Sequence, residues 1–387
     1  MSSSIPLSAP SIGANEWKYV KECLDTEWVS SAGKYVERFE QEIAHYVSSK
    51  YAVACVNGTA ALHVALRIVG VEEGSEVIVP TLTFIAPVNA VHYLGAHPVF
   101  VDCDDFYNLD VEKAIEFIVT QTIFRGGYSY NTNTRRRISA IVPVHVFGNA
   151  ADLKELLNIC RDRNIKVVED ATESLGSRYV PDYLGGKHTG TVGDVGCFSF
   201  NGNKIITTGG GGMIVADSAD LASKARYLTT QAKDDEVTYV HNEVGYNYRL
   251  TNIQAAMGVA QLEQLATFLK AKRSNYQTYK QHINKIEGLR LAEMPPYASN
   301  NCWMYALQVE ESAFGVDKET LRRRLASSGI ESRPIWKLNH LQLPYCRCEA
   351  FRIERAPRLI HISLNIPCSS NLTEEQMRKV MSALRHE

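Results

Sequence analysis

Three separated segments of the chain carry residue types that together could bind and activate a carbonyl compound. The first is an apolar run that ends in Asn57-Gly58-Thr59 and continues into an alanine-rich helical pattern. The second places Asp170 at the end of another apolar run, and the third places Lys204 in a polar stretch that leads into consecutive glycines. The three segments therefore offer an anion site, a carboxylate and an amine.

Each of these groups suits a definite chemical task. A helix that starts at Gly58-Thr59 would present free N–H groups and a partial positive charge to a phosphate, and the Thr59 hydroxyl could add a hydrogen bond. Asp170 stands at the carboxyl end of a predicted buried strand, where open α/β sheets bind ligands, and its carboxylate could keep a ring nitrogen protonated. Lys204 could form a Schiff base with a carbonyl group if burial lowers its pKa.

Each segment taken alone also has an ordinary structural explanation. The Gly58-Thr59 turn and Asp170 could each cap a helix, and an isolated lysine is usually a solvated surface residue. The first segment is neither a GxGxxG fingerprint nor a P-loop, which disfavours dinucleotide binding and nucleoside triphosphate hydrolysis. The catalytic interpretation depends on the three segments occurring together.

The elements that must position these residues can be predicted from hydrophobic periodicity. Short apolar runs alternate with helical patterns and predict strands at 51–56, 76–79, 98–101, 138–144, 166–168, 195–200 and 212–215. This alternation indicates a largely parallel sheet covered by helices. From Thr251 the pattern predicts a long linking helix, followed by a strand at 303–309, a helix at 318–327 and a terminal helix opened by a Thr373/Gln376 capping box. We expect a large domain at 1–250 and a smaller one at 251–387.

Composition excludes several classes of function. Lysine and arginine number 41 against 43 acidic residues, so the net charge of −2 provides no overall field for nucleic acid or anionic membranes. The one basic cluster, 135–137, is expected to be a solvated loop. No long apolar run or signal peptide is evident, and nine scattered cysteines without a CxxC pair argue against disulfides or structural zinc. We predict a cytoplasmic protein that binds no metal, nucleic acid or membrane.

At its chemically interesting positions the sequence resembles the DegT/StrS family of pyridoxal-phosphate (PLP)-dependent sugar-nucleotide aminotransferases. The matching motifs, in family order, are Asn57-Gly-Thr-Ala-Ala-Leu62, Pro80-Thr-Leu-Thr-Phe84, Pro143-Val-His-Val-Phe-Gly148, Glu169-Asp-Ala171, Phe198-Ser-Phe200 with Lys204, and Gly245-Tyr-Asn-Tyr-Arg249. The resemblance extends from Ile5 to beyond Pro367. It implies the aspartate-aminotransferase fold (PLP fold type I), with a large, mixed but mostly parallel sheet domain and a smaller C-terminal α/β domain.

The resemblance also implies roles for two catalytic residues. Lys204 would form the Schiff base with PLP and move protons, and Asp170 would pair with the pyridine nitrogen. Glu173 would lie at the cofactor where the family often has glutamine or histidine, so its contacts to the ring or substrate should differ. Because Lys204 stands where dehydrating members of the family have histidine, dehydration is disfavoured.

Further positions would bind the cofactor. Gly58, Thr59 and Ser199 would hold the phosphate, and Phe84 would stack on the ring, although packing in the core is the alternative for Phe84. Asn247 would reach the phosphate of the neighbouring subunit. This implies a homodimer with shared active sites.

Several motifs most resemble the LegC-type subgroup, which aminates C4 of UDP-4-keto-6-deoxy-N-acetylhexosamines for bacterial surface glycans of the bacillosamine or legionaminic acid type. These motifs are Trp28-Val-Ser-Ser31 with Lys34-Tyr-Val36, the stretch 198–209, and Arg333-Pro-Ile-Trp336. Substrate contacts are expected from Arg333 and, with structural packing as the alternative, from Trp28 and His188. Glutamate would supply the amino group to a UDP-linked 4-keto-6-deoxy sugar.

Other functions remain open at this point. A GDP-perosamine synthase-like enzyme or a dTDP-keto-sugar aminotransferase would share every catalytic residue and differ only in substrate contacts. Outside this reaction class, a non-catalytic PLP-binding regulator or a cysteine desulfurase is possible, although the chain has no basic DNA-binding face. Sequence spacing does not separate the nucleotides.

Overall fold

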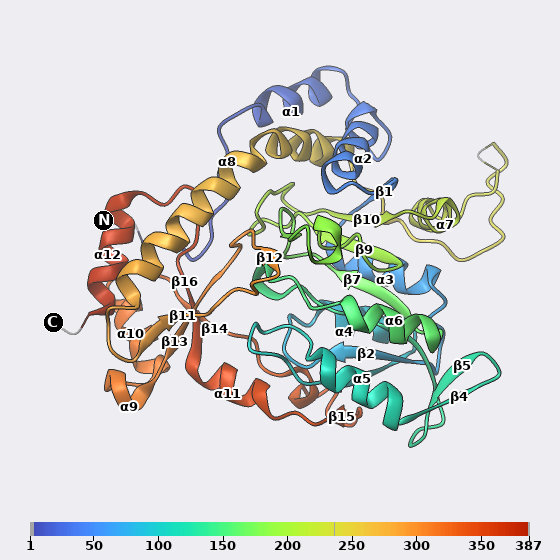
Figure 1. Ribbon diagram of the computed structural model, residues 1–387. Coiled ribbons are helices and arrows are strands. Elements are labelled where there is room, and N and C mark those ends of the chain that lie inside the picture. The colour runs from blue at the N-terminus through green and yellow to red at the C-terminus, as the bar shows by residue number, and fades with distance from the viewer. Residues whose placement is uncertain (1–3, 236, 386–387) are drawn as a thin grey trace.

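The computed structural model, which describes residues 4–235 and 237–385, contains a ten-stranded sheet covered by helices on both faces (Figure 1). The main strand order is β1-β10-β9-β7-β6-β2-β3-β15, and the β4–β5 hairpin pairs with β6. The strands are β1 (Tyr51–Cys55), β2 (Glu76–Pro80), β3 (His97–Val101), β4 (Thr122–Arg125), β5 (Tyr128–Asn131), β6 (Arg137–Ile141), β7 (Lys166–Asp170), β9 (Val195–Ser199), β10 (Gly212–Ala216) and β15 (Ala350–Phe351). Along this order β10 is antiparallel to β1 and β9, and the remaining pairs are parallel.

Alternating side chains of the strands pack against different helices, as the two-residue period of a strand requires. Val77 and Val79 of β2 join a core with α3 (Gly58–Ile68), α4 (Ala86–Tyr93) and α7 (Ala219–Thr229). Ile78 faces the opposite side, where it packs with α5 (Val111–Thr120) and α6 (Lys154–Asp162). On that same side, α2 (Lys34–Val47) covers Ala52 and Ala54 of β1. Both faces are therefore buried, which explains the nearly continuous apolar strand sequences.

The long helix α8 (Asn252–Ile283) connects this sheet to a second, four-stranded antiparallel sheet (Figure 1). Thr251 and Gln254 form a capping box at its start, so its first N–H groups are satisfied. The second sheet has the order β11 (Leu289–Leu291), β13 (Tyr305–Val309), β16 (Ser363–Ile366) and β14 (Arg333–Pro334). Around it lie α9 (Glu311–Phe314), α10 (Lys318–Ser327), α11 (Arg355–Ile362) and α12 (Glu374–Leu384), and α1 (Glu16–Asp25) packs along α8.

Two segments pass between the large sheet and the smaller one. Residues 350–351 return to the large sheet as β15, which pairs in parallel with β3. In the other direction, Ile5 forms a parallel bridge with Ile330, and the Cys368 N–H donates to the Leu7 carbonyl. A small two-stranded sheet joins β8 (Arg178–Tyr179) to β12 (Ala298–Ser299). The division of the chain at residue 250 stays a prediction, because neither part is assembled from one continuous stretch.

The predicted strands, the linking helix and the capped terminal helix are confirmed, with small differences at their ends. The prediction of a solvated loop at the basic cluster is wrong in part. Arg135 is exposed, but Arg137 is the first residue of β6, and its guanidinium carbon lies 4.0 Å from the centroid of the Tyr128 ring. The strands β4 and β5 before it form a hairpin because Gly126 and Gly127 adopt the positive φ values, 58° and 83°, that tight hairpin turns need.

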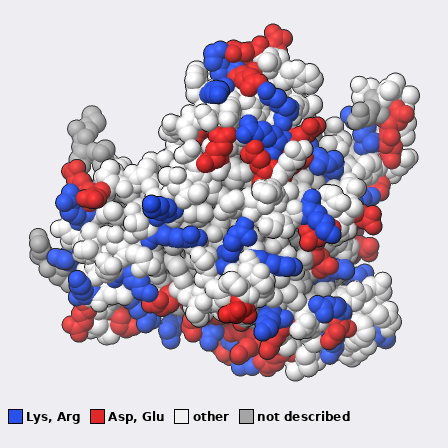
Figure 2. Space-filling model, turned by 45° about the horizontal axis from the view of Figure 1, so that its top comes forward, with Lys and Arg blue, Asp and Glu red and all other residues white. Residues whose placement is uncertain are grey.

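Surface charge is mixed. Basic and acidic side chains are interspersed over the face shown in Figure 2, as expected for a net charge of −2. Among the residues that the structure describes, no helix is long and apolar enough to cross a membrane.

Candidate active site

Most of the predicted site residues meet in one cavity of about 700 Å³. Its wall includes Gly58, Thr59, Phe84, Glu173, Ser199, Lys204 and Arg333. The first two open α3 directly after β1, Glu173 follows the end of β7, and Ser199 ends β9. Because β1, β7 and β9 run in the same direction, their carboxyl ends lie at one edge of the sheet. The topology therefore brings together segments that are well over a hundred residues apart.

The start of α3 forms a close-fitting cradle for an anion. Asn57 caps the helix, and its Oδ1 accepts the Ala60 N–H at 2.8 Å. A Cβ atom added to Gly58 would lie 2.9 Å from Ser199 Cβ and 3.2 Å from Thr172 Cγ2, so only glycine allows this approach. The first N–H groups of a helix have no partner within it, and here they lie beside the hydroxyls of Thr59 and Ser199.

Lys204 enters this cavity with only 12% of its side chain exposed. Its Nζ lies 3.8 Å from Glu173 Oε1 and 4.0 Å from the centroid of the Trp303 ring. Burial lowers the pKa of Lys204, and the nearby carboxylates Glu173 and Asp170 partly oppose that effect. A lowered pKa increases the fraction of neutral amine, which is the form that attacks a carbonyl carbon.

Two buried carboxyl groups lie close to this single lysine. Asp170 ends β7 with 2% exposure, and its Oδ1 accepts the Thr172 N–H at 3.1 Å. Burial raises the pKa of Asp170, while Thr172 and Lys204 act to lower it. Burial also raises the pKa of Glu173, to about 7, although Lys204 and the Phe147 N–H, 2.8 Å from Glu173 Oε2, favour its ionised form. Glu173 can therefore exchange a proton near neutral pH.

Aromatic side chains form one wall of the cavity. The Phe84 ring is 52% exposed, and its centroid lies 6.3 Å from that of Trp336. The Phe147 ring packs against the other side of this wall, 5.2 Å from Trp336. Phe147 has a left-handed backbone, with φ at 58°, which the hydrogen bond to Glu173 helps to hold. The exposed face of Phe84 offers a stacking surface for a planar ring.

The structure places His188 away from the cavity, in contrast to the substrate contact expected from the sequence. It is fully buried, its Nε2 accepts the Gly176 N–H at 2.7 Å, and its Nδ1 lies 2.6 Å from the Thr189 carbonyl oxygen. Burial lowers the pKa of His188 to about 3, so the ring is neutral. Both nitrogens are occupied by the backbone, and His188 serves packing instead.

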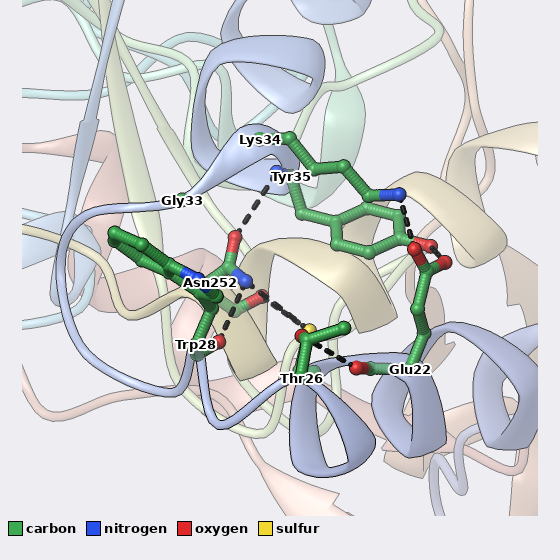
Figure 3. A pocket seen from close by; sticks show the side chains of 8 residues that line it. Glu22, Thr26, Trp28, Gly33, Lys34, Tyr35 and Asn252 are labelled. Atoms are coloured by element: carbon green, nitrogen blue, oxygen red, sulfur yellow. Dashed lines mark hydrogen bonds and ion pairs between the residues drawn. The ribbon is translucent and has the colours of Figure 1, made fainter.

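Trp28 also lies outside the large cavity. It lines a separate pocket of about 340 Å³ between α1, α2 and α8 (Figure 3). There Asn252 Nδ2 donates to the Trp28 carbonyl at 2.7 Å, and Asn252 Oδ1 accepts the Tyr35 N–H at 3.0 Å. The Trp28 ring itself is 59% exposed. Within this chain it contacts none of the predicted catalytic residues.

Some residues that line the cavity were not predicted, because no motif in the sequence marked them. Trp303, Glu331 and Asn365 reach it from the smaller sheet and its loops. Asn365 is 6% exposed, and its Oδ1 has no hydrogen-bond partner among the described residues. In the sequence only the aromatic character of Trp303, at the start of a predicted strand, gave any signal.

The residues present fit PLP. Its phosphate matches the cradle at Gly58 and Ser199, its aldehyde matches the amine of Lys204, and its pyridine nitrogen calls for a buried carboxylate such as Asp170. No group of three or more His, Cys, Asp or Glu side chains that could hold a metal occurs in the described part of the chain. The fold and this cavity define an enzyme of the aspartate-aminotransferase fold that uses PLP.

Comparisons with known proteins give the family. The DegT/DnrJ/EryC1/StrS aminotransferase family model matches residues 10–385. A GDP-perosamine synthase of Caulobacter vibrioides is 40% identical over 98% of this chain and 97% of its own length. A putative pyridoxal phosphate-dependent aminotransferase, EpsN of Bacillus subtilis, is 36% identical over 100% of this chain and 96% of its own. The chain belongs to the DegT/DnrJ/EryC1/StrS aminotransferase family.

A solved structure supports the same assignment. DesI, crystallised in the presence of its TDP-sugar product, superposes with a TM-score of 0.87 at 25% identity and covers 99% of this chain and 93% of its own. The predicted fold class, cofactor and enzyme class are confirmed. The protein is a PLP-dependent sugar-nucleotide aminotransferase, whereas the expected LegC-type subgroup is not specified by the family match.

Proposed function

We propose that the enzyme transfers an amino group from glutamate to C4 of a 4-keto-6-deoxy sugar linked to GDP, as a perosamine-forming enzyme would. The observation that carries this choice is the 40% identity, over nearly the full length of both chains, to a GDP-perosamine synthase. The product would serve the synthesis of a bacterial surface polysaccharide. Glutamate and the keto sugar would occupy the same cavity in turn.

Lys204 is the residue that we assign to covalent capture of the cofactor and to proton movement. Its side chain is buried in the cavity and its pKa is lowered, so a neutral amine is accessible. PLP, when bound, accepts the amino group and delocalises the electrons freed at the adjacent carbon. Asp170, buried at the end of β7, would keep the ring nitrogen protonated, and Gly58, Thr59 and Ser199 would hold the phosphate.

The wall of the cavity that comes from the C-terminal part of the chain, formed by 331–336 and Asn365, is assigned to the substrates. Arg333 is 69% exposed at its side chain and is paired with Glu331 at 2.8 Å, so its charge remains accessible to an anionic group. Asn365 lies beside it in register, because β14 pairs with β16. These two residues offer a cation and a hydrogen-bonding amide to a diphosphate or a carboxylate.

A UDP-linked N-acetylated 4-keto-6-deoxy sugar is the second candidate. The motifs Trp28-Val-Ser-Ser31 and Arg333-Pro-Ile-Trp336 favour it, because they resemble the LegC-type subgroup. Both candidates require the same amination at C4 and the same catalytic residues. The two substrates differ in the nucleotide and at C2 of the sugar.

A homodimer with shared active sites is part of this proposal. Asn247 is exposed and does not line the cavity of its own chain. The segment before it carries exposed apolar side chains, with Val237 at 86%, Tyr239 at 70% and Val244 at 85% exposure. Such a surface fits burial against a second subunit, whose phosphate site Asn247 would complete.

A substrate panel tests the proposal. The purified protein, loaded with PLP and glutamate, is given GDP-, UDP- and dTDP-linked 4-keto-6-deoxy sugars, and products are identified by mass spectrometry and NMR. Preferred amination of the GDP sugar at C4 is expected. Preference for the UDP sugar would replace the first candidate with the second, and the absence of amination of any sugar would refute both.

A variant tests the assignment of the lysine. Lys204→Ala should remain folded but lose both turnover and the absorption band of the covalently bound cofactor. Retention of that band, or of turnover, would show that another residue carries the chemistry. Circular dichroism and size measurements serve as the controls for folding and assembly.

A further inference from the structure

We propose that Trp303 is a positioning residue of the active site, which together with Glu173 holds the ammonium group of Lys204 whenever that lysine is free. This inference rests on the proposed assignment of Lys204 as the cofactor-binding lysine. It adds an aromatic partner from the C-terminal part of the chain to the catalytic residues of the large sheet.

Two different parts of the Trp303 side chain contact the lysine segment. Its ring centroid lies 4.0 Å from Lys204 Nζ, within the range of a strong cation–π contact. Its Nε1 donates to the carbonyl oxygen of Asn203, the residue before the lysine, at 2.7 Å. The ring is therefore fixed relative to both the backbone and the amine of this segment.

Two hydrogen bonds, one within the same loop and one from α8, hold the backbone of Trp303. Its N–H donates to Asn301 Oδ1 at 2.9 Å, and its carbonyl oxygen accepts from Lys272 Nζ of α8 at 2.9 Å. Lys272 is itself 3% exposed and also donates to the Cys368 carbonyl. Because a buried lysine donates to both of these backbone carbonyls, the backbone of the loop at Trp303 is held in a defined position.

The same loop is tied to the second partner of Lys204. Asn301 Nδ2 donates to the Glu173 carbonyl at 2.9 Å and to the Leu175 carbonyl at 3.0 Å. Asn301 thus links the backbones of Trp303 and Glu173, the two residues that contact the ammonium group.

A strained turn aims the ring. Cys302 has a φ of 57°, in the left-handed region that residues with a Cβ rarely adopt, and its N–H donates to the Asn300 side chain. Such a conformation persists only when the surrounding contacts enforce it, and it is typical of functional sites.

The two partners act differently on the lysine. The charged groups that face Lys204 are Glu173 and Asp170. Glu173 lies 3.8 Å from the amine, an ion-pair distance, so it can take a proton from the amine through one bridging water. Trp303 stabilises the cation, but its indole does not titrate and so cannot act as a base. It therefore holds the ammonium in place and opposes the effect of burial, while Glu173 removes the proton when the amine must react.

The test is the pH dependence of cofactor capture by the full-length apoenzyme. The neutral amine of Lys204 adds to the aldehyde carbon of PLP and water leaves, so the capture rate reports the fraction of neutral lysine. Trp303→Leu removes the cation–π contact, and Trp303→Phe retains part of it with a smaller change in volume. Trp17→Leu, at a 75% exposed position of α1, is the matched control.

We expect the midpoint of the pH profile to move to lower pH by about 0.4–1.5 units in Trp303→Leu, the equivalent of about 0.5–2 kcal/mol. A smaller shift in the same direction is expected for Trp303→Phe, and none for Trp17→Leu. An unchanged midpoint, a shift to higher pH, or equal shifts in the Leu and Phe variants would overturn the inference.

A parallel measurement separates this inference from the assignment on which it rests. Lys204→Ala should show no covalent capture at any pH. If it still captures PLP covalently, the assignment of the lysine fails. If it does not, and the Trp303 variants behave as the wild type, the lysine stands and only the role of Trp303 fails.

Discussion

Replacing Gly58 with alanine should impair cofactor binding without impairing folding. The new Cβ would lie 2.9 Å from Ser199 Cβ, whereas carbon atoms pack at about 3.5–4.0 Å. The start of α3 and the end of β9 must therefore separate by roughly 0.6 Å or more, which is beyond the tolerance of about 0.5 Å for a preorganised site. Alanine favours helix over glycine, so α3 itself should not be weakened.

The expected size of the effect follows from the cost of overpacking. An inserted methyl group in a closely packed site costs about 1–3 kcal/mol. If that strain is relieved by opening the phosphate cradle, the dissociation constant of PLP should rise by about 5- to 150-fold. Titration of the apoenzyme with PLP, followed by quenching of tryptophan fluorescence, measures this constant.

A neighbouring glycine provides the control. Gly202 belongs to the loop that carries Lys204, and a Cβ added there meets nothing within 4 Å. Gly202→Ala should therefore bind PLP as the wild type does. If Gly58→Ala binds PLP as tightly as Gly202→Ala, the closeness of α3 to β9 does not shape the phosphate site and the reasoning is refuted.

Three further changes test other parts of the site. Asp170→Asn should retain PLP but lose about 10²–10⁴-fold in turnover, because an amide does not stabilise the protonated ring nitrogen; single-turnover kinetics measure the loss, and an unchanged rate would remove this role. Glu173 ionises in the unfolded chain near its ordinary pKa of 4.5 but in the folded protein only near 7, so folding loses stability as the pH rises between these values. Glu173→Gln should therefore make the apoenzyme about 3 kcal/mol more resistant to urea than the wild type at pH 8, with little difference near pH 4; a difference independent of pH would contradict the assigned burial effect. Finally, Asn247→Ala should weaken cofactor binding, and under conditions where it and Lys204→Ala are each inactive, mixing the two should restore roughly a quarter of wild-type activity. Half of the dimers would then hold one intact site if each site draws on both subunits; no recovery after verified subunit exchange would argue against sharing.

The residues of the large sheet that we assign to the cofactor could be singled out from the sequence because they lie at or shortly after the ends of recognisable strands. In a mostly parallel sheet, the carboxyl ends of parallel strands share one edge, and the ends of β1, β7 and β9 lie together for this reason. The capping box at Thr251 likewise marked the start of α8. Local sequence patterns were therefore enough to locate strand ends and helix starts.

Other features depend on tertiary contacts that leave no local signal. The position of Trp303 against Lys204 requires the course of α8, the Lys272 hydrogen bond and the turn at Cys302 together. His188 was a candidate for substrate contact with structural packing as the alternative, and the structure supports packing because its two nitrogens lie against buried backbone groups. The β4–β5 hairpin was not predicted, because strands of four residues are too short to show a clear alternation.

The cofactor and the substrate are assigned to groups from different sheets of the molecule. This difference explains why the sequence indicated the reaction more clearly than the substrate. The groups assigned to the cofactor come from strand ends of the large sheet, where topology fixes their geometry. The groups assigned to the sugar and nucleotide, Arg333 and Asn365, come from paired short strands of the smaller sheet. Substitutions on those strands can change the hydrogen bonds offered to a nucleotide or an N-acetyl group while Lys204 and Asp170 stay in place. Selection between GDP and UDP sugars should therefore be decided on β14, β16 and the loops beside them.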